Sequence, residues 1–354
     1  MSTSQHGASN PEYVNARVRS RRQKLFGDED YRKLVRMGPG GIARFMEESE
    51  YEREINSLGS RYDGVDLIEY ALHANLAKHF DDLLEWSEGT LYDLIARYLR
   101  KFDVWNVKTA LRGIYTDADA EAIQADYIRA GEFDDRLLDR LSEAGSVEDA
   151  IELLDGTVFH EPLDGAYEAF EAEGLLVPLE NAADRAFYEL LLSDVSVGPN
   201  AEGPRARYVE FLEAEIDFRN ARNALRLART GADIDPAEFF IEGGTLFDER
   251  ELRQLVGNFD ELVAHIRDSH YGDELDVALD ELEGAESLIG FEHALEAALL
   301  EYSDRLSNVY PVSIAAVLSY ILAKEREVEN VRAIARGREA GLDESEIEEE
   351  LVIL

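Results

Sequence analysis

The sequence contains no cysteine, which excludes disulfide bonds, thiolate metal sites and cysteine nucleophiles. Basic residues are scarce, with 36 Lys and Arg against 76 Asp and Glu. A protein that binds DNA or RNA needs a basic face to neutralise phosphates, so this composition argues against nucleic acid as a partner. Long hydrophobic runs are also lacking. The most apolar stretch, residues 312–323, is too short to cross a bilayer and is predicted to be a buried helix.

The charge balance gives a formal net charge of −40 at pH 7. A charge of this size repels itself in the compact state unless counterions screen it. Lysine is especially rare, with six lysines against thirty arginines. The pattern favours a solvated, halophile-like surface in a salt-rich cytoplasm over a specific site for a basic partner. Residues 1–11 lack the layout of a signal peptide and are predicted to be a disordered lead.

Apolar residues recur at spacings of three and four through most of the chain, while strand signals are nearly absent. We therefore predict an all-α protein. Residues 37–41, MGPGG, do not match a phosphate-binding loop, because no Lys-Ser or Lys-Thr follows at the required distance. A plain turn is expected there.

One helical motif occurs three times, at intervals close to 110 residues. It reads NVKTALR at 106–112, NARNALR at 220–226 and NVRAIAR at 330–336. An acid stands three residues before each asparagine, and an aspartate able to cap a following helix comes after each motif. The acids are Asp103, Asp217 and Glu327, and the expected caps are Asp119, Asp235 and Asp343. A weaker echo at 12–21 places Asn15 in the same slot.

Two further alignments support the repeat. Residues 72–82, 179–189 and 291–301 superpose as one amphipathic helix, and residues 128–141 resemble residues 241–255. A period this long does not fit the familiar helical solenoids. We predict three similar helical modules, at 1–112, 113–226 and 227–354.

The repeated helix carries two cations one turn apart, which repel each other unless an acid compensates. One acid ends the preceding amphipathic helix in each module, and an arginine can bind such a carboxylate with two hydrogen bonds. These residues either hold each module together or contact a partner, and the first interpretation is favoured. The candidates are Asp82, Asn106, Lys108 and Arg112; Glu189, Asn220, Arg222 and Arg226; and Glu301, Asn330, Arg332 and Arg336.

Catalytic patterns do not appear. The seven histidines and many acids form no paired carboxylate-and-histidine pattern of a di-iron bundle. The sequence also has no Gly-flanked serine nucleophile and no Walker motif. We therefore expect no catalytic residues, metal, cofactor or small-molecule substrate. The basic cluster at 17–24 is expected to be a helix face near acids, with contact to a membrane or partner as the alternative.

The chain resembles the C subunit of archaeal A-type and bacterial V-type rotary ATP synthases, which is similar to the d subunit of eukaryotic V-ATPases. The resemblance rests on YVNARVRSR near the start, on residues 310–347 near the end, and on the threefold repeat. It runs through essentially the whole chain.

The resemblance implies three helical lobes in a funnel-like, pseudo-threefold arrangement. It implies a peripheral protein at the cytoplasmic face of the cell membrane, between the proteolipid ring and the central-stalk subunits of an ATP synthase complex. A protein in this position is non-catalytic and couples ion flow to ATP synthesis or hydrolysis. Two other hypotheses stay open at this point: a free-standing helical scaffold or adaptor, and a metal-dependent helical-bundle enzyme.

Overall fold

The computed structural model describes residues 9–193, 195, 203–231, 234–284 and 289–352. Within these ranges the chain is all-α and forms no strand, as the spacing of apolar residues predicts. The chain folds into two compact units, residues 1–92 with 259–354 and residues 93–258. The division into three modules stays a prediction.

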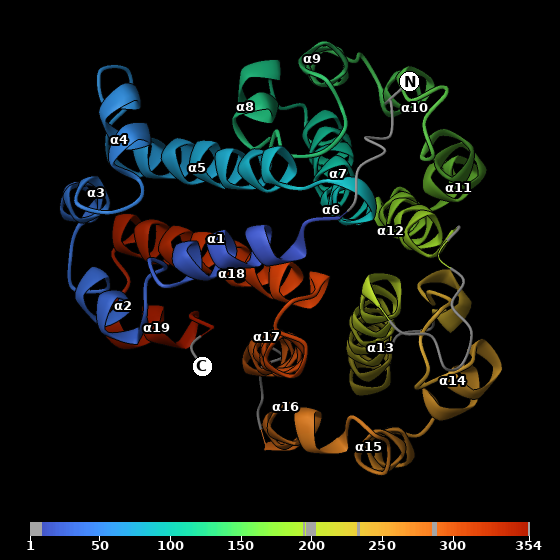
Figure 1. The fold of residues 1–354 in the computed structure, drawn as a ribbon. Helices are drawn as coiled ribbons and strands as arrows, with labels where there is room; N and C mark the ends of the chain where they lie inside the picture. The colour runs from blue at the N-terminus through green and yellow to red at the C-terminus, as the bar shows by residue number, and fades with distance from the viewer. Residues whose placement is uncertain (1–8, 194, 196–202, 232–233, 285–288, 353–354) are drawn as a thin grey trace. The chain divides into compact units, whose positions relative to one another are not determined.

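The unit that combines the two ends of the chain contains helices from both. Its helices are α1 (Pro11–Arg22), α2 (Asp28–Leu34), α3 (Pro39–Glu47), α4 (Glu52–Leu58), α5 (Gly64–Trp86), α15 (Phe259–Arg267), α16 (Gly272–Gly284), α17 (Ile289–Val309), α18 (Ile314–Ala340) and α19 (Glu344–Glu349). The long helix α18 packs against α5, α17 and α1 (Figure 1). It begins with Ile314 and the buried apolar run after it, in agreement with the predicted buried helix.

The unit formed by residues 93–258 is built around α7 and α12. Its helices are α6 (Gly89–Leu99, which starts just before the unit boundary), α7 (Lys101–Tyr115), α8 (Ala120–Ala125), α9 (Asp135–Ser142), α10 (Val147–Leu153), α11 (His160–Glu173), α12 (Val177–Leu192), α13 (Pro204–Thr230), the 3-10 helix η1 (Pro236–Glu238) and α14 (Glu249–Leu255). Helix α7 packs against α12, α9 and α10, and α12 packs against α11 and α13.

The chain is ordered from an earlier point than expected. Residues 1–8 lie outside the described part, but residues 9–11 of the expected disordered lead are fixed. Asn10 donates to the carbonyl oxygen of Trp86 at 2.8 Å, and Pro11 begins α1. Proline suits the first helical position because it has no N–H to leave unpaired.

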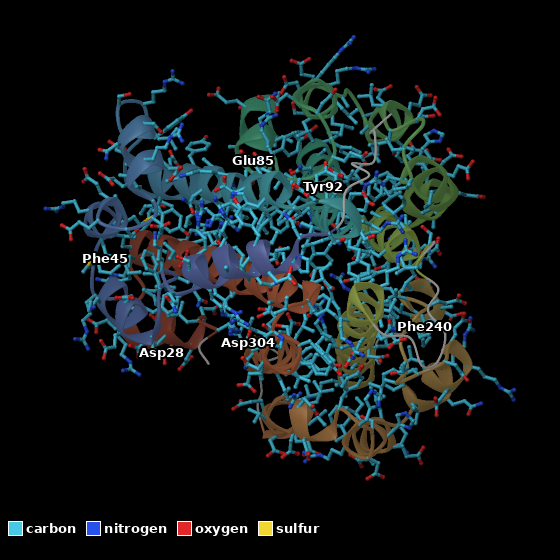
Figure 2. The ribbon with its side chains drawn as sticks, in the orientation of Figure 1. Asp28, Phe45, Glu85, Tyr92, Phe240 and Asp304 are labelled. Atoms are coloured by element: carbon cyan, nitrogen blue, oxygen red, sulfur yellow. The ribbon has the colours of Figure 1, made fainter. Side chains whose placement is uncertain are left out.

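The surface of the described residues is rich in carboxylates. Oxygen-tipped side chains project outward from the helices (Figure 2). Because acids outnumber cations about twofold, the ion pairs between them leave a large negative excess in contact with solvent. The fold thus buries its apolar faces while it carries the charge outside.

Candidate functional site

The repeated asparagine fastens a later backbone segment to its helix. Asn106, on α7, donates from Nδ2 to the carbonyl oxygen of Ile128 at 2.8 Å and accepts from the Ile128 N–H at 2.9 Å. Each of the three asparagines is 1% exposed. The other copies make the same two bonds, between Asn220 and Ile241 and between Asn330 and Val352, at 2.8 to 3.0 Å. An amide suits this position because it carries both a donor and an acceptor.

The fourth, weaker copy does not share this arrangement. Asn15 donates to the carbonyl oxygens of Pro11 and Ser313, at 2.7 and 3.2 Å. Its Oδ1 atom is buried without a hydrogen-bond partner in the described structure. The echo in the N-terminal sequence therefore marks a different contact.

The aspartates after the repeated helices cap the segments that follow, as predicted. The side chains of Asp119, Asp235 and Asp343 accept from the backbone N–H of Ala122, Ala237 and Glu346. A Cβ atom at Gly113 would meet the side chain of Ile123 at 2.4 Å, so glycine lets the capped helix approach closely. Gly337 plays the same part in the third copy. Leu227 occupies that position in the second copy, where the capped segment is the short η1.

The acid before the asparagine binds a second stretch of backbone. Asp103 accepts from the N–H groups of Glu132 and Phe133 at 2.9 and 3.0 Å. In the second copy, Asp217 accepts from the N–H groups of Thr245 and Leu246. Burial raises the pKa of Asp103 to about 7, against the lowering effect of its backbone hydrogen bond and of Arg100.

Two glycines make room for these buried carboxylates. A Cβ atom at Gly131 would lie 2.0 Å from Oδ1 of Asp103, and one at Gly244 would lie 2.1 Å from Oδ1 of Asp217. Any side chain there would push the carboxylate away from its donors. The resemblance between residues 128–141 and 241–255 thus has a steric cause.

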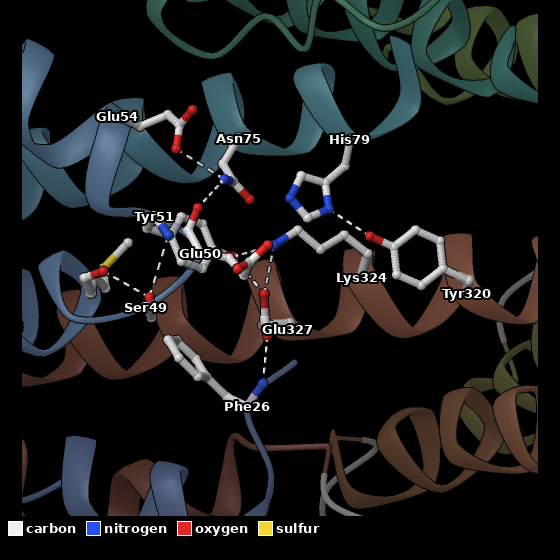
Figure 3. Close-up of polar contacts among 11 residues, drawn as sticks. Phe26, Ser49, Glu50, Tyr51, Glu54, Asn75, His79, Tyr320, Lys324 and Glu327 are labelled. Atoms are coloured by element: carbon white, nitrogen blue, oxygen red, sulfur yellow. Dashed lines mark hydrogen bonds and ion pairs between the residues drawn. The ribbon is translucent and has the colours of Figure 1, made fainter. Parts of the chain in front are cut away.

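The acid of the third copy is the centre of a buried polar network (Figure 3). Glu327 accepts from the Phe26 N–H at 2.6 Å, from the Tyr51 hydroxyl at 2.7 Å and from Lys324 Nζ at 2.6 Å. Lys324 is completely buried, and its Nζ also donates to the Tyr51 hydroxyl at 2.8 Å. Burial lowers the pKa of Lys324, and the neighbouring Glu327 opposes that change.

The repeated cations on α7 bind acids of α12. Lys108 donates to Asp184 at 2.7 Å, and Arg112 makes two bonds to Glu180 at 2.6 and 2.9 Å. Burial disfavours the charged form of Asp184, but Arg219, Lys108 and Arg222 outweigh it and hold the pKa of that carboxyl below its usual value. These side chains connect the helices of this unit.

The third copy repeats this pattern between cations on α18 and acceptors on α5. Arg336 donates to both carboxylate oxygens of Glu69, and Arg332 donates to Nε2 of His73. As in the pair Glu180 and Asp184, the two acceptors are four residues apart, one helical turn. Two cations spaced by one turn therefore meet two acceptors spaced by one turn on a packed helix.

In the first copy, the acid expected to compensate these cations does not do so. Asp82 pairs with Arg21 instead. Glu189 and Glu301 are exposed, and their pairing with the repeated arginines of their own modules stays a prediction. Glu189 lies five residues after Asp184 on α12, which is about 140° around the helix, so its side chain points away from the face that meets α7. In the second copy, Arg226 is exposed on α13.

The basic cluster at 17–24 is held by internal contacts. Arg22 donates to both oxygens of Asp304 on α17, at 2.6 Å each, and Asp304 is labelled in Figure 2. Lys24 pairs with Glu50 at 2.8 Å. The guanidinium of Arg17 lies over the rings of Tyr13 and Trp86, at 4.7 and 4.8 Å. Together with the pair between Arg21 and Asp82, these contacts support the interpretation of a helix face near acids.

One repeated feature was missed in the sequence. In each copy a hydroxyl accepts from the backbone N–H two residues later, and that residue is a buried aromatic at the start of a helix. The pairs are Ser49 with Tyr51, Thr157 with Phe159, and Ser269 with Tyr271. Aligning residues 37–51 with 144–159 and 256–271 reveals the signal, because all three segments run from a glycine turn through a short helix to the aromatic.

These centres are suited to holding helices and backbone together. The carboxylates of Asp103, Asp217 and Glu327 are each occupied by backbone N–H groups or by Tyr51 and Lys324. Across the described residues, His, Asp and Glu side chains form no group of three placed to hold a metal ion. No helix in those ranges is long and apolar enough to span a bilayer.

The fold and these centres define an all-helical protein in which repeated buried acids and amides bind backbone segments distant in the sequence. The chain belongs to the ATP synthase (C/AC39) subunit family, which it matches over residues 14–350. The C subunit of the A-type ATP synthase from Haloferax volcanii is 67% identical over 98% of this chain and 99% of its own length. The protein of the same name from Halorubrum lacusprofundi is 65% identical over 98% of this chain and 99% of its length. That from Methanococcoides burtonii is 37% identical over 98% and 95%.

Removing one repeated asparagine is expected to destabilise the fold. Asn220→Ala leaves the N–H and the carbonyl of Ile241 buried without their partner, which costs about 2–4 kcal/mol for the two groups. The measurement is urea unfolding followed by circular dichroism. Asn223→Ala, at a half-buried position of the same helix, is the control and should change stability by less than about 0.5 kcal/mol. Equal losses of stability in the two variants would show that the two hydrogen bonds of Asn220 do not stabilise the fold.

The raised pKa of Asp103 predicts a pH dependence. Between about pH 4 and 7 the folded state binds a proton that the unfolded state releases, so this residue lowers stability as pH rises. The shift from 3.8 to about 7 corresponds to up to about 4 kcal/mol. Asp103→Asn should therefore flatten the fall in unfolding free energy over this range. Asp135→Asn, an exposed site with the same charge change, should not. Parallel pH profiles of wild type and Asp103→Asn would contradict the assignment.

Proposed function

We propose that this chain is a non-catalytic central-rotor subunit of an A-type ATP synthase. In this role it links the membrane proteolipid ring to the central-stalk subunits and couples ion translocation to ATP synthesis or hydrolysis. The observation that carries the proposal is the near full-length match to the C subunits of A-type ATP synthases. The chain would work as a peripheral protein at the cytoplasmic face of the membrane.

The use of the buried acids supports a mechanical role. In each of the three centres, the acid is hydrogen-bonded to backbone or side-chain groups of the same chain, as the bonds of Asp103 and Glu327 show. A subunit that transmits torque needs cross-links of this kind between helices that are distant in sequence. Three copies of one helix also suit a funnel-like arrangement with pseudo-threefold symmetry, in which one copy serves each lobe.

Co-purification tests this proposal. The affinity-tagged chain is expressed in place of the native one, membranes are solubilised in mild detergent at molar salt, and the bound proteins are identified by mass spectrometry. Proteolipid and stalk subunits are expected in the eluate and not in a control with the tag alone. Recovery of the chain without either would favour the free-standing adaptor. A separate titration with ATP should show no binding to the purified chain.

A further inference from the structure

The third polar centre is assembled from the two ends of the chain. In the first copy, Ile128 binds the asparagine and Glu132, four residues later, binds the acid. The second copy uses Ile241 and Thr245 in the same way. In the third copy the asparagine binds Val352, close to the C-terminus, whereas the acid binds Phe26, close to the N-terminus.

The segment after Phe26 forms a short helix, as the corresponding segments of the other two copies do. Phe26, Phe133 and Phe247 each stand one residue before the N-cap of a short helix, which is α2, α9 or α14. In the third copy, N-terminal residues thus bind the acid in the way that the segment just after the asparagine's partner does in the other two copies. A contact that is covalently continuous in two copies is a noncovalent joint in the third.

Helix α1, which precedes this joint, lies across helices from both ends of the sequence. Arg21 pairs with Asp82 on α5, and Arg22 pairs with Asp304 on α17. Val14 and Val18 of this helix are buried. These four side chains fasten the N-terminal segment from outside the polar centre.

We propose that residues 11–36 form a detachable strap, and that its release opens the third repeat at Glu327. When the strap leaves, water replaces the Phe26 N–H at the carboxylate and reaches Lys324, so both buried charges regain hydration. In the other copies the backbone bound to the acid stays tethered to the backbone bound to the asparagine by a few residues. In those two copies, no segment can leave the acid while the segment at the asparagine stays in place.

A short connection supplies the hinge for this movement. The strap ends before Met37 and Gly38, and α3 begins at Pro39. A Cβ atom at Gly38 would meet nothing within 4 Å, so packing does not require glycine at this position. Backbone freedom is what this glycine contributes.

The proposed function gives such a joint a use. Only this use, and not the strap itself, rests on the proposed function. An opening in the wall of the subunit would let a central-stalk partner enter or leave from the side. A strap closed by noncovalent contacts gives a defined place for that opening, whereas unfolding any continuous repeat would disrupt the whole chain. The opening itself is a property of the isolated protein.

Hydrogen exchange of the full-length chain in molar salt, read by mass spectrometry, tests the strap. Amides of residues 14–35 should exchange together and at least about tenfold faster than those of residues 120–142, the matched continuous segment. Glu327→Gln should accelerate the strap at least about tenfold further and leave residues 120–142 unchanged. Gly38→Ala, which stiffens the hinge, should slow the exchange of the strap.

The hydrogen-exchange rates of the strap can also contradict the proposal. If the strap exchanges at the rate of the α18 core, both in the wild type and in Glu327→Gln, the strap does not detach and the proposal is wrong. Arg22→Gln provides a variant that leaves the polar centre intact, and it should accelerate only the strap. Because the measurement uses the chain without partners, failure of co-purification would not affect it.

Discussion

Glu327→Ala is expected to lower the free energy of unfolding by about 3–5 kcal/mol, because it leaves the charge of Lys324 buried without its partner. The variant also removes the acceptor for the Phe26 N–H and the Tyr51 hydroxyl. Urea titration at constant molar salt gives the free energy. An effect of this size would place Glu327 among the most sensitive positions of the chain.

The matched control is Glu249→Ala, which removes the same charge from an exposed pair with Arg253. Its cost should be at most about 1 kcal/mol. The double variant Lys324→Met and Glu327→Leu should recover much of the loss, because two apolar side chains leave no unpaired charge. Similar stability of Glu327→Ala and Glu249→Ala would mean that the buried network contributes nothing specific.

Withdrawal of salt is expected to unfold the protein. The formal charge of −40 repels itself, and the screening distance grows from about 3 Å at 1 M salt to about 30 Å at 0.01 M. The melting temperature should therefore fall steeply as salt is removed, and the chain should unfold at low ionic strength at room temperature. Circular dichroism during dialysis from molar to millimolar KCl follows the change.

A non-ionic control separates screening from general solvent effects. Sucrose strengthens burial without adding ions, so replacing salt by sucrose should restore only part of the stability. A variant with several exposed acids of α16 and α19 changed to their amides should need less salt than the wild type. Equal melting temperatures in molar and millimolar salt would contradict the electrostatic account.

Local patterns explain why much of the fold could be predicted from the sequence. The period of the apolar residues predicts the helices, and the spacing from the repeated helix to Asp119, Asp235 and Asp343 predicts three caps that the structure contains. These features depend on neighbours a few residues apart. Composition and helix geometry are enough to recognise them.

Contacts between distant segments could not be predicted in the same way. The choice of Glu180 and Asp184 over Asp82 as the partners of Arg112 and Lys108 depends on which helix face meets α7, and only packing decides that. The split third repeat was hidden because its parts lie at opposite ends of the sequence. Lys324 gives no local sign of burial either, since a lysine near several acids usually marks a solvated face.

The measurement that tests the proposed function most directly is ATP-driven ion uptake by membrane vesicles, compared with ATP hydrolysis in the same preparation. Vesicles from cells that lack this chain should hydrolyse ATP without ion uptake, and re-addition of the wild-type protein should restore uptake. Normal coupled uptake in its absence would contradict the account of the chain as a rotor subunit that joins ring and stalk.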